Sequence, residues 1–256
     1  MEALDRILSQ VKASGINTSS SNPYKCLKCK DTTWIAGEEG YKRCECYELA
    51  HIESLWENFG VKLKDIKLLK EYEPYNDSTK KAKEKAAEYI RSFDEIKNTR
   101  ENGFALLGQP GAGKTHIVLA IGKALLEKKI SVVYMPYLEV IKELKALAMY
   151  QEDYEKLLSR YTRAKVLIID DLFKDKVKKG RIAAELSETD LKHIYPILNY
   201  RYLNYLPTII SSECTPNMLL ELDEALGGRI LETTGPRFSL TFKGDCNYRL
   251  KKFMKE

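Results

Sequence analysis

The sequence predicts an α/β fold in which a mainly parallel, five-stranded sheet lies between helices and follows a small metal-stabilised module. Beyond about residue 100, short apolar runs alternate with stretches of helical period, which is typical of strands buried on both faces. Near the start, four of the six cysteines lie within 21 residues. The 256 residues have room for one packed domain and a smaller appendage.

The composition is that of a water-soluble protein, with 44% hydrophobic and 31% charged residues. No apolar run approaches the roughly 20 residues of a membrane span. Residues 1–12 contain acidic side chains and no unbroken apolar core, so they do not form a signal peptide. We therefore expect a cytoplasmic protein without membrane contact. Its net charge of +5 is spread along the chain, so contact with nucleic acid requires a local basic patch.

The N-terminal region predicts a helix over residues 2–13, which places Leu4, Ile7, Leu8 and Val11 on one face. We interpret this face as packing on a neighbouring element, with partner docking as the alternative. Gly15 and the Asn/Ser run that follows it end the helix.

Two cysteine pairs come next, separated by fourteen residues that include turn formers. Four thiolates brought together across a short hairpin form a tetrahedral zinc site without an open catalytic position. In a reducing compartment this clustering favours metal over disulfides, and His51 remains an alternative ligand. The predicted zinc ligands are Cys26, Cys29, Cys44 and Cys46. The isolated Cys214 and Cys246 have no base partner in the sequence and are interpreted as inert core thiols.

The remaining pattern divides the chain into an N-terminal region with the zinc site over residues 1–60, a linker over 61–77 and a larger α/β domain over 78–256. Predicted strands cover residues 104–107, 131–135, 165–169, 208–211 and 238–242. Predicted helices cover residues 48–59, 78–97, 114–128, 137–149, 152–160 and 188–203.

The stretch from Gly108 to Thr115 has the spacing G-x-x-x-x-G-K-T between a predicted strand and a predicted helix. Glycines let backbone N–H groups turn around phosphate oxygens, and the positive end of the helix points at them. Lys114 would reach the β- and γ-phosphates of ATP, and Thr115 would bind Mg²⁺. The predicted nucleotide contacts here are Gly108, Pro110, Gly111, Ala112, Gly113, Lys114, Thr115 and His116.

The apolar strand at residues 166–169 ends in Asp170 and Asp171. A phosphate-loop ATPase needs an acid at such a strand end to hold Mg²⁺, which is the predicted role of Asp170. Asp171 is placed to orient or activate the attacking water.

These motifs, with residues 209–213 and 227–230, resemble the AAA+ ATPases. In particular, the chain resembles the replicative-helicase loaders of the DnaC/DnaI group, of the phage type. A four-cysteine module before the ATPase core is similar to the DnaI-type arrangement. Transposition helpers of the IstB type are also similar. The resemblance implies an AAA+ core without a separate helical lid. It also implies that Ser212 or Glu213 senses the γ-phosphate, although relatives often have Asn where this chain has Glu213.

The resemblance further implies that Arg229 is an arginine finger acting on the ATP of a neighbouring subunit, and that Arg249 is a second nucleotide sensor. A finger shared across an interface requires self-association. The segment after Asp171 carries five basic residues that we interpret as contacting single-stranded DNA, with a solvated loop as the alternative. These residues are Lys174, Lys176, Lys178, Lys179 and Arg181.

The sequence therefore predicts an Mg²⁺-dependent ATPase that loads a DnaB-type hexameric helicase onto single-stranded DNA in a bacterial host cytoplasm. Its cofactors are ATP, Mg²⁺ and Zn²⁺. The main alternative is an IstB-like transposition helper. A small-molecule kinase fits less well, because no arginine-rich lid is visible in the sequence.

Overall fold

The computed structural model describes residues 23–37, 40–244 and 247–248 of the chain. The helix predicted over residues 2–13 lies outside them. The chain divides into two compact units, residues 1–47 and 48–256. Within the described residues, no helix is long and apolar enough to cross a membrane.

The first unit contains an antiparallel hairpin of β1 (Trp34–Gly37) and β2 (Gly40–Arg43), in which Trp34 lies opposite Arg43. The Arg43 guanidinium lies over the rings of Trp34 and Tyr47, at 4.0 and 4.2 Å from their centroids. This arrangement is a pair of cation–π contacts on one face of the hairpin.

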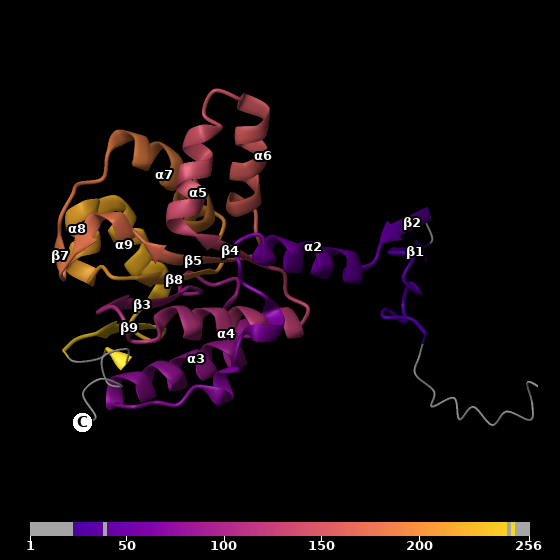
Figure 1. The fold of residues 1–256 in the computed structure, drawn as a ribbon, viewed down its shortest axis with the longest axis horizontal. Helices are drawn as coiled ribbons and strands as arrows, with labels where there is room; N and C mark the ends of the chain where they lie inside the picture. Colours follow the sequence, from indigo (N-terminus) through magenta and orange to yellow (C-terminus); the bar gives the residue numbers. More distant parts are fainter. Residues whose placement is uncertain (1–22, 38–39, 245–246, 249–256) are drawn as a thin grey trace, which may run out of the picture. The chain divides into compact units, whose positions relative to one another are not determined.

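The second unit is built on a five-stranded sheet in the order β4-β5-β8-β3-β9 (Figure 1). All neighbouring strands in it are parallel, as predicted. Because parallel strands end at the same edge, loops after β3, β5 and β8 converge on one site. The strands are β3 (Phe104–Gly108), β4 (Val132–Pro136), β5 (Val166–Leu172), β8 (Thr208–Ser212) and β9 (Ser239–Phe242).

Helices cover both faces of the sheet (Figure 1). One face packs against α2 (Glu45–Glu57), α3 (Asp77–Ile96) and α4 (Lys114–Glu127). The other packs against α5 (Tyr137–Ala146), α6 (Gln151–Thr162), α7 (Glu188–Leu203), α8 (Pro216–Leu222) and α9 (Glu224–Thr234). Sequence periodicity does not predict α8 or α9, because α8 has only seven residues and α9 begins directly after its C-cap.

Alternation along the strands separates two hydrophobic cores. In β3, Phe104 and Leu106 belong to the core beneath α3 and α4, whereas Ala105 and Leu107 belong to the core beneath α5 and α7. All five residues of this strand are buried, as expected of a strand covered on both sides.

The segment before α3 differs from the predicted boundary. Trp56 is fully buried in the core of the second unit, and its Nε1 donates to the carbonyl of Val132 at 2.9 Å. Farther along, the 3₁₀ turns Leu63–Asp65 and Leu69–Glu71 lead to the buried Tyr72. Because these side chains pack on the sheet and its helices, the compact units meet between residues 47 and 48, not within the predicted linker at 61–77.

Arg201 on α7 holds several loops at the amino-terminal edge of the sheet. Its side chain is 1% exposed, and burial lowers the pKa of its guanidinium to about 9. Five hydrogen bonds compensate the buried charge, so one side chain ties α7 to the start of β8 and to the α6–β5 loop. The acceptors are the hydroxyl of Thr208 and the carbonyl oxygens of Tyr161, Thr162, Ala164 and Pro207.

We expect Arg201→Lys to lower the free energy of unfolding by about 3 kcal/mol. The lysine ammonium cannot reach all the acceptors that the planar guanidinium reaches, so some carbonyl oxygens would stay buried without a donor. Urea unfolding followed by circular dichroism measures the change. The control is Arg163→Lys at an exposed position, where a shift below about 0.5 kcal/mol is expected. Equal midpoints for both variants would contradict this account.

Candidate functional site

The phosphate loop connects β3 to α4 and depends on three glycines with left-handed backbones. Gly108, Gly111 and Gly113 have φ of 88°, 77° and 83°. A Cβ on Gly108 would also lie 2.4 Å from the carbonyl oxygen of Phe242. Residues with side chains are therefore excluded from these turns, which position the backbone ahead of the first turn of α4.

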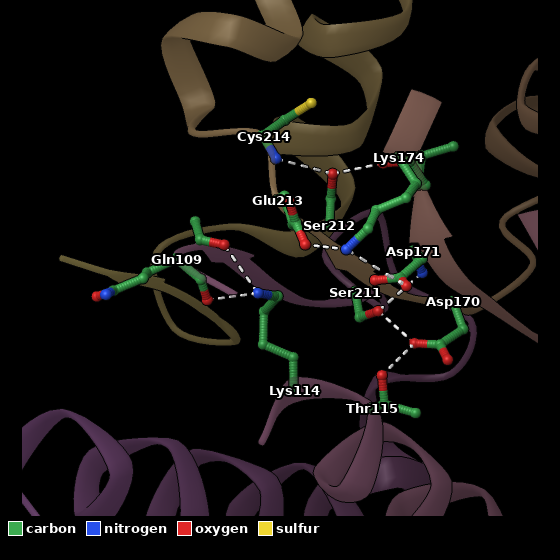
Figure 2. A network of polar contacts seen from close by, with 12 residues as sticks. Gln109, Lys114, Thr115, Asp170, Asp171, Lys174, Ser211, Ser212, Glu213 and Cys214 are labelled. Carbon is green, nitrogen blue, oxygen red and sulfur yellow. Dashed lines mark hydrogen bonds and ion pairs between the residues drawn. The ribbon is translucent and has the colours of Figure 1, made fainter. Parts of the chain in front are cut away.

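Lys114 is the first residue of α4 and lies in the mouth of this loop. Its Nζ donates to the carbonyl oxygens of Gly108 and Gln109, at 2.8 and 2.7 Å (Figure 2). Burial lowers the pKa of Lys114 to about 8, although the carboxylates of Asp171 and Asp170 partly oppose the shift. Phosphate oxygens would be stronger acceptors for this ammonium than the two carbonyls are.

Asp170, at the carboxyl end of β5, is the most highly connected acid of the site. Oδ1 accepts hydrogen bonds from the hydroxyls of Thr115, at 3.0 Å, and Ser211 (Figure 2). Oδ2 accepts one from the hydroxyl of Tyr134, at 3.0 Å. Burial raises the pKa of Asp170 and these hydroxyls oppose the rise. The structure thus brings together the predicted pair Thr115 and Asp170, together with Ser211 and Tyr134, which the sequence analysis missed.

Asp171 and Glu213 meet through a lysine. Lys174 Nζ forms an ion pair with Glu213 and lies 3.8 Å from Asp171 Oδ2 (Figure 2). Asp171 has a left-handed backbone with φ 55°, and its N–H donates to Ser211 Oγ at 3.0 Å. The loop after β5 is therefore held in a fixed conformation beside the end of β8.

Ser212 and Glu213, both predicted as sensor candidates, have different surroundings. The Ser212 hydroxyl is fully buried, donates to the carbonyl of Leu172 at 2.6 Å and accepts from the N–H of Cys214. Glu213 lines the cavity beside the phosphate loop, whereas Ser212 does not. Of the pair, Glu213 has the geometry to contact a ligand.

A cavity of about 490 Å³ opens beside the phosphate loop, a size suited to a nucleotide. Aromatic rings line it: Tyr72 packs edge-on against His116 at 5.3 Å, and Tyr75 lies 5.2 Å from Tyr248. Residues 67–75 supply part of this wall, although they were predicted to be linker. Predicted nucleotide contacts among the lining are Pro110, Gly111, Gly113, Lys114, Thr115, His116 and Glu213; Asp171, predicted to act on water, and Lys174, predicted to contact DNA, also line it. Ala112 is fully buried behind it.

Arg229 lies on α9, outside the residues that line this cavity. Its guanidinium lies over the rings of Tyr195 and Tyr202, at 5.2 and 5.5 Å from their centroids. Nη1 is buried without a hydrogen-bond partner among the described residues. Arg229 therefore does not contribute to the nucleotide cavity of its own chain. Arg249 and Cys246 lie outside the described residues.

The segment predicted to contact DNA has fewer exposed basic side chains than its composition suggests. β6 (Val177–Lys178) and β7 (Arg181–Ile182) form a short hairpin. Lys176 is buried against Asp190, 2.7 Å away, and Lys174 pairs with Glu213. The structure gives no support to the prediction that Lys176 contacts DNA, because its charge is paired inside the protein. Exposed basic side chains remain at Lys178, Lys179 and Arg181.

In the first unit the four predicted cysteines form one cluster, with all sulfurs within 4.8 Å of one another. The Cys26–Cys44 and Cys29–Cys46 sulfurs are 3.7 and 3.4 Å apart, too far for disulfides. Zn–S bonds of about 2.3 Å in a tetrahedron place sulfurs about 3.8 Å apart, so the cluster fits zinc. His51 is exposed and is not part of this group.

Hydrogen bonding to the backbone of Cys29 lowers the pKa of Cys26 to about 7, whereas hydrogen bonding to the Cys29 side chain raises the pKa of Cys46. The pKa values of Cys26 and Cys46 are thus shifted in opposite directions, and a bound cation would stabilise the thiolates together.

Comparison with known proteins decides the family. The model of the IstB-like ATP binding proteins matches residues 57–212. The chain belongs to this family. Among its relatives, XkdC of the phage-like element PBSX of Bacillus subtilis is 35% identical over 247 residues, or 91% of this chain and 89% of that protein. YqaM of Bacillus subtilis is 40% identical over 212 residues, or 80% of this chain, but the chain covers only 64% of YqaM.

Helicase loaders are also similar to this IstB-like protein. The replicative helicase loader DnaI of Bacillus subtilis is 30% identical over 134 residues, or 52% of this chain and 39% of DnaI. The crystal structure of the DnaC helicase loader superimposes with a TM-score of 0.57 and 27% identity, covering 69% of this chain and 96% of that one. Proteins of this family are AAA+ ATPases, which confirms the predicted fold and the predicted ATPase class.

We expect about one zinc ion per chain in the purified protein. Cys44→Ser should release it, because Cys44 is fully buried within the cluster and a hydroxyl is a poor replacement for a thiolate. Elemental analysis after gel filtration measures the metal. Cys214→Ser serves as the control, because this buried cysteine lies in the second unit. Zinc retention in Cys44→Ser equal to that of the control would remove the cluster as a metal site.

Proposed function

We propose that this protein is an ATP-dependent loader that places a DnaB-type replicative helicase on single-stranded DNA. The observation that carries the proposal is the joining of a four-cysteine cluster to an IstB-like ATPase core that matches the DnaC helicase loader. The similarity to DnaI over half of the chain supports the same role. As a soluble replication protein of the phage type, it would act in the bacterial cytoplasm.

The nucleotide would be held by the residues around the phosphate loop. Lys114 would move its hydrogen bonds from two backbone carbonyls to phosphate oxygens. Thr115 and Asp170, already hydrogen-bonded to each other, would hold Mg²⁺, which supplies positive charge to the phosphates. The rings of Tyr72 and Tyr75 would line the site of the base.

For hydrolysis, Asp171 would orient the attacking water, and Glu213 would report on the γ-phosphate through its ion pair with Lys174. Lys174 begins the segment that leads to the β6–β7 hairpin. A change at Glu213 would therefore reach the exposed Lys178, Lys179 and Arg181, which we propose as contacts to DNA phosphates. Arg249 is proposed as a second sensor.

The cysteine cluster would hold the N-terminal unit in the shape that binds the helicase, with zinc as a structural ion. ATP binding would favour a self-associated, DNA-binding state, and hydrolysis would release the helicase or the DNA. Such a switch requires only that ATP and ADP bind the two states with different affinities.

A transposition helper is the second candidate, because the matching family model is that of IstB-like proteins. Co-purification distinguishes the two: the proposal expects the replicative helicase of the host on the tagged protein, whereas the alternative expects a transposase. Capture of a transposase without helicase would overturn the loader proposal.

The loading reaction itself tests the proposal. We expect the purified protein to transfer its helicase onto circular single-stranded DNA in the presence of ATP and Mg²⁺, measured as helicase retained on DNA after gel filtration.

Asp171→Asn should bind ATP but turn it over roughly 100-fold more slowly, because the water-orienting carboxylate is lost, and should trap the assembly. Lys114→Ala should fail to bind ATP productively. Transfer that is equally efficient without ATP would contradict the mechanism.

Mixed assemblies test the proposed finger. Arg229→Ala and Lys114→Ala should each reduce hydrolysis by roughly 100-fold or more, since one lacks the finger and the other lacks a working phosphate site. Mixing the two should restore activity, because the intact Arg229 of one subunit completes the intact ATP site of the other. Arg237→Ala, at an exposed arginine, is the control and should remain active. Absence of restored activity in the mixture would exclude a shared site.

A further inference from the structure

Tyr134 makes a contact that neither the ATPase motifs nor the helicase-loading proposal requires. It lies on β4, beside β5, and its hydroxyl donates to Asp170 Oδ2 at 3.0 Å. An ionised carboxylate accepts hydrogen bonds only, so this tyrosine must be the donor. Thr115 and Ser211 both bond to the other oxygen, Oδ1. Tyr134 is therefore the one described side chain that holds Oδ2.

Two aromatic side chains pack against the ring of Tyr134 and hold it in place. Trp56 of α2 lies 5.4 Å away between ring centroids, and Phe59 meets the ring edge-on at 6.3 Å. Trp56 is itself fixed, because its Nε1 donates to the carbonyl of Val132, two residues earlier on β4. A buried tyrosine packed in this way has little freedom to turn its hydroxyl away from Asp170.

The helix that follows the phosphate loop leaves space for this packing. A Cβ on Gly122 of α4 would come within 2.5 Å of Ile168 Cδ1 and 2.7 Å of Trp56 Cη2. Glycine at this position therefore lets the tryptophan ring lie directly against α4 and β5. The elements that carry Thr115 and Tyr134 thus lie against one indole ring, and Ile168 of β5, the strand of Asp170, belongs to the same core.

We propose that Tyr134 is a positioning residue for Asp170, and that Trp56 couples this position to α2. The hydroxyl fixes the carboxylate so that Oδ1 faces Thr115, and these two residues would hold Mg²⁺ when nucleotide binds. The proposal rests on the proposed role of Asp170 in holding Mg²⁺. It also links α2 to the nucleotide site through the packing of Trp56 on Tyr134. Along the chain, α2 begins directly after Cys44 of the cysteine cluster.

Tyr134→Phe tests the hydroxyl alone, because it keeps the ring against Trp56. Losing a group that orients a metal ligand typically costs about 10-fold or more in metal affinity or activity. We therefore expect the Mg²⁺ concentration for half-maximal ATP hydrolysis to rise about 10-fold, with kcat reduced and the KM for ATP little changed. A merely structural tyrosine would lower the unfolding midpoint without moving the Mg²⁺ requirement.

Tyr137→Phe is the matched control. Tyr137 is also buried, lies three residues farther along the chain, and its hydroxyl has no hydrogen-bond partner among the described residues. Its loss should leave the Mg²⁺ requirement unchanged. Equal Mg²⁺ requirements for Tyr134→Phe and the control would overturn the positioning role.

Trp56 supplies a spectroscopic readout. The chain has two tryptophans, so Trp34→Phe leaves Trp56 as the only indole. In this background we expect Mg²⁺ with ADP to change the emission of Trp56, and Tyr134→Phe to abolish the change while nucleotide still binds. An emission change of the same size with and without the Tyr134 hydroxyl would overturn the coupling.

Asp170→Asn separates this inference from the function on which it rests. Full Mg²⁺-dependent hydrolysis in Asp170→Asn would remove the proposed metal site and the inference with it. An inactive Asp170→Asn beside a wild-type-like Tyr134→Phe would refute the inference alone and leave the ATPase site intact.

Discussion

A buried carboxylate organises the nucleotide site. Removing an ionised acid from water costs several kcal/mol unless hydrogen bonds or opposite charge replace the lost hydration. Asp170 is 6% exposed, and hydroxyls from three different elements replace that hydration. The helix after the phosphate loop and strands β4 and β8 must therefore keep their register relative to β5. The same contacts therefore order the nucleotide site and fix the register of the sheet.

Local spacing in the sequence was enough to predict the parts of the site that one segment forms. The phosphate loop needs glycines and a lysine at fixed intervals along the chain. Strand β5 is recognisable in the sequence as an apolar run that ends in two acids. Five strands and the longer helices followed from periodicity for the same reason. Tyr134 and Ser211 could not be found this way, because each is an ordinary strand residue until the sheet order places it beside Asp170.

The basic segment after β5 shows the opposite difficulty. Its composition indicates a DNA-binding loop, but composition does not distinguish cations that face water from cations used inside the protein. Lys176 and Lys145 share the carboxylate of Asp190; burial alone would raise the pKa of this acid, yet the lysines and Ser187 hold it well below its usual range. These contacts tie the hairpin to α7 and α5, so part of the positive charge stabilises the loop next to the nucleotide.

The two units differ in how they can be stable. Among the described residues of the first unit, only Cys29 and Cys44 are buried, and so few apolar contacts cannot offset the entropy of ordering the chain. A metal bound by four thiolates can supply the missing free energy. The second unit has two extensive hydrophobic cores of its own, one of which includes Trp56 and Tyr72. The stability of the second unit, and with it the site around Asp170, therefore depends on its own hydrophobic cores and not on the cysteine cluster.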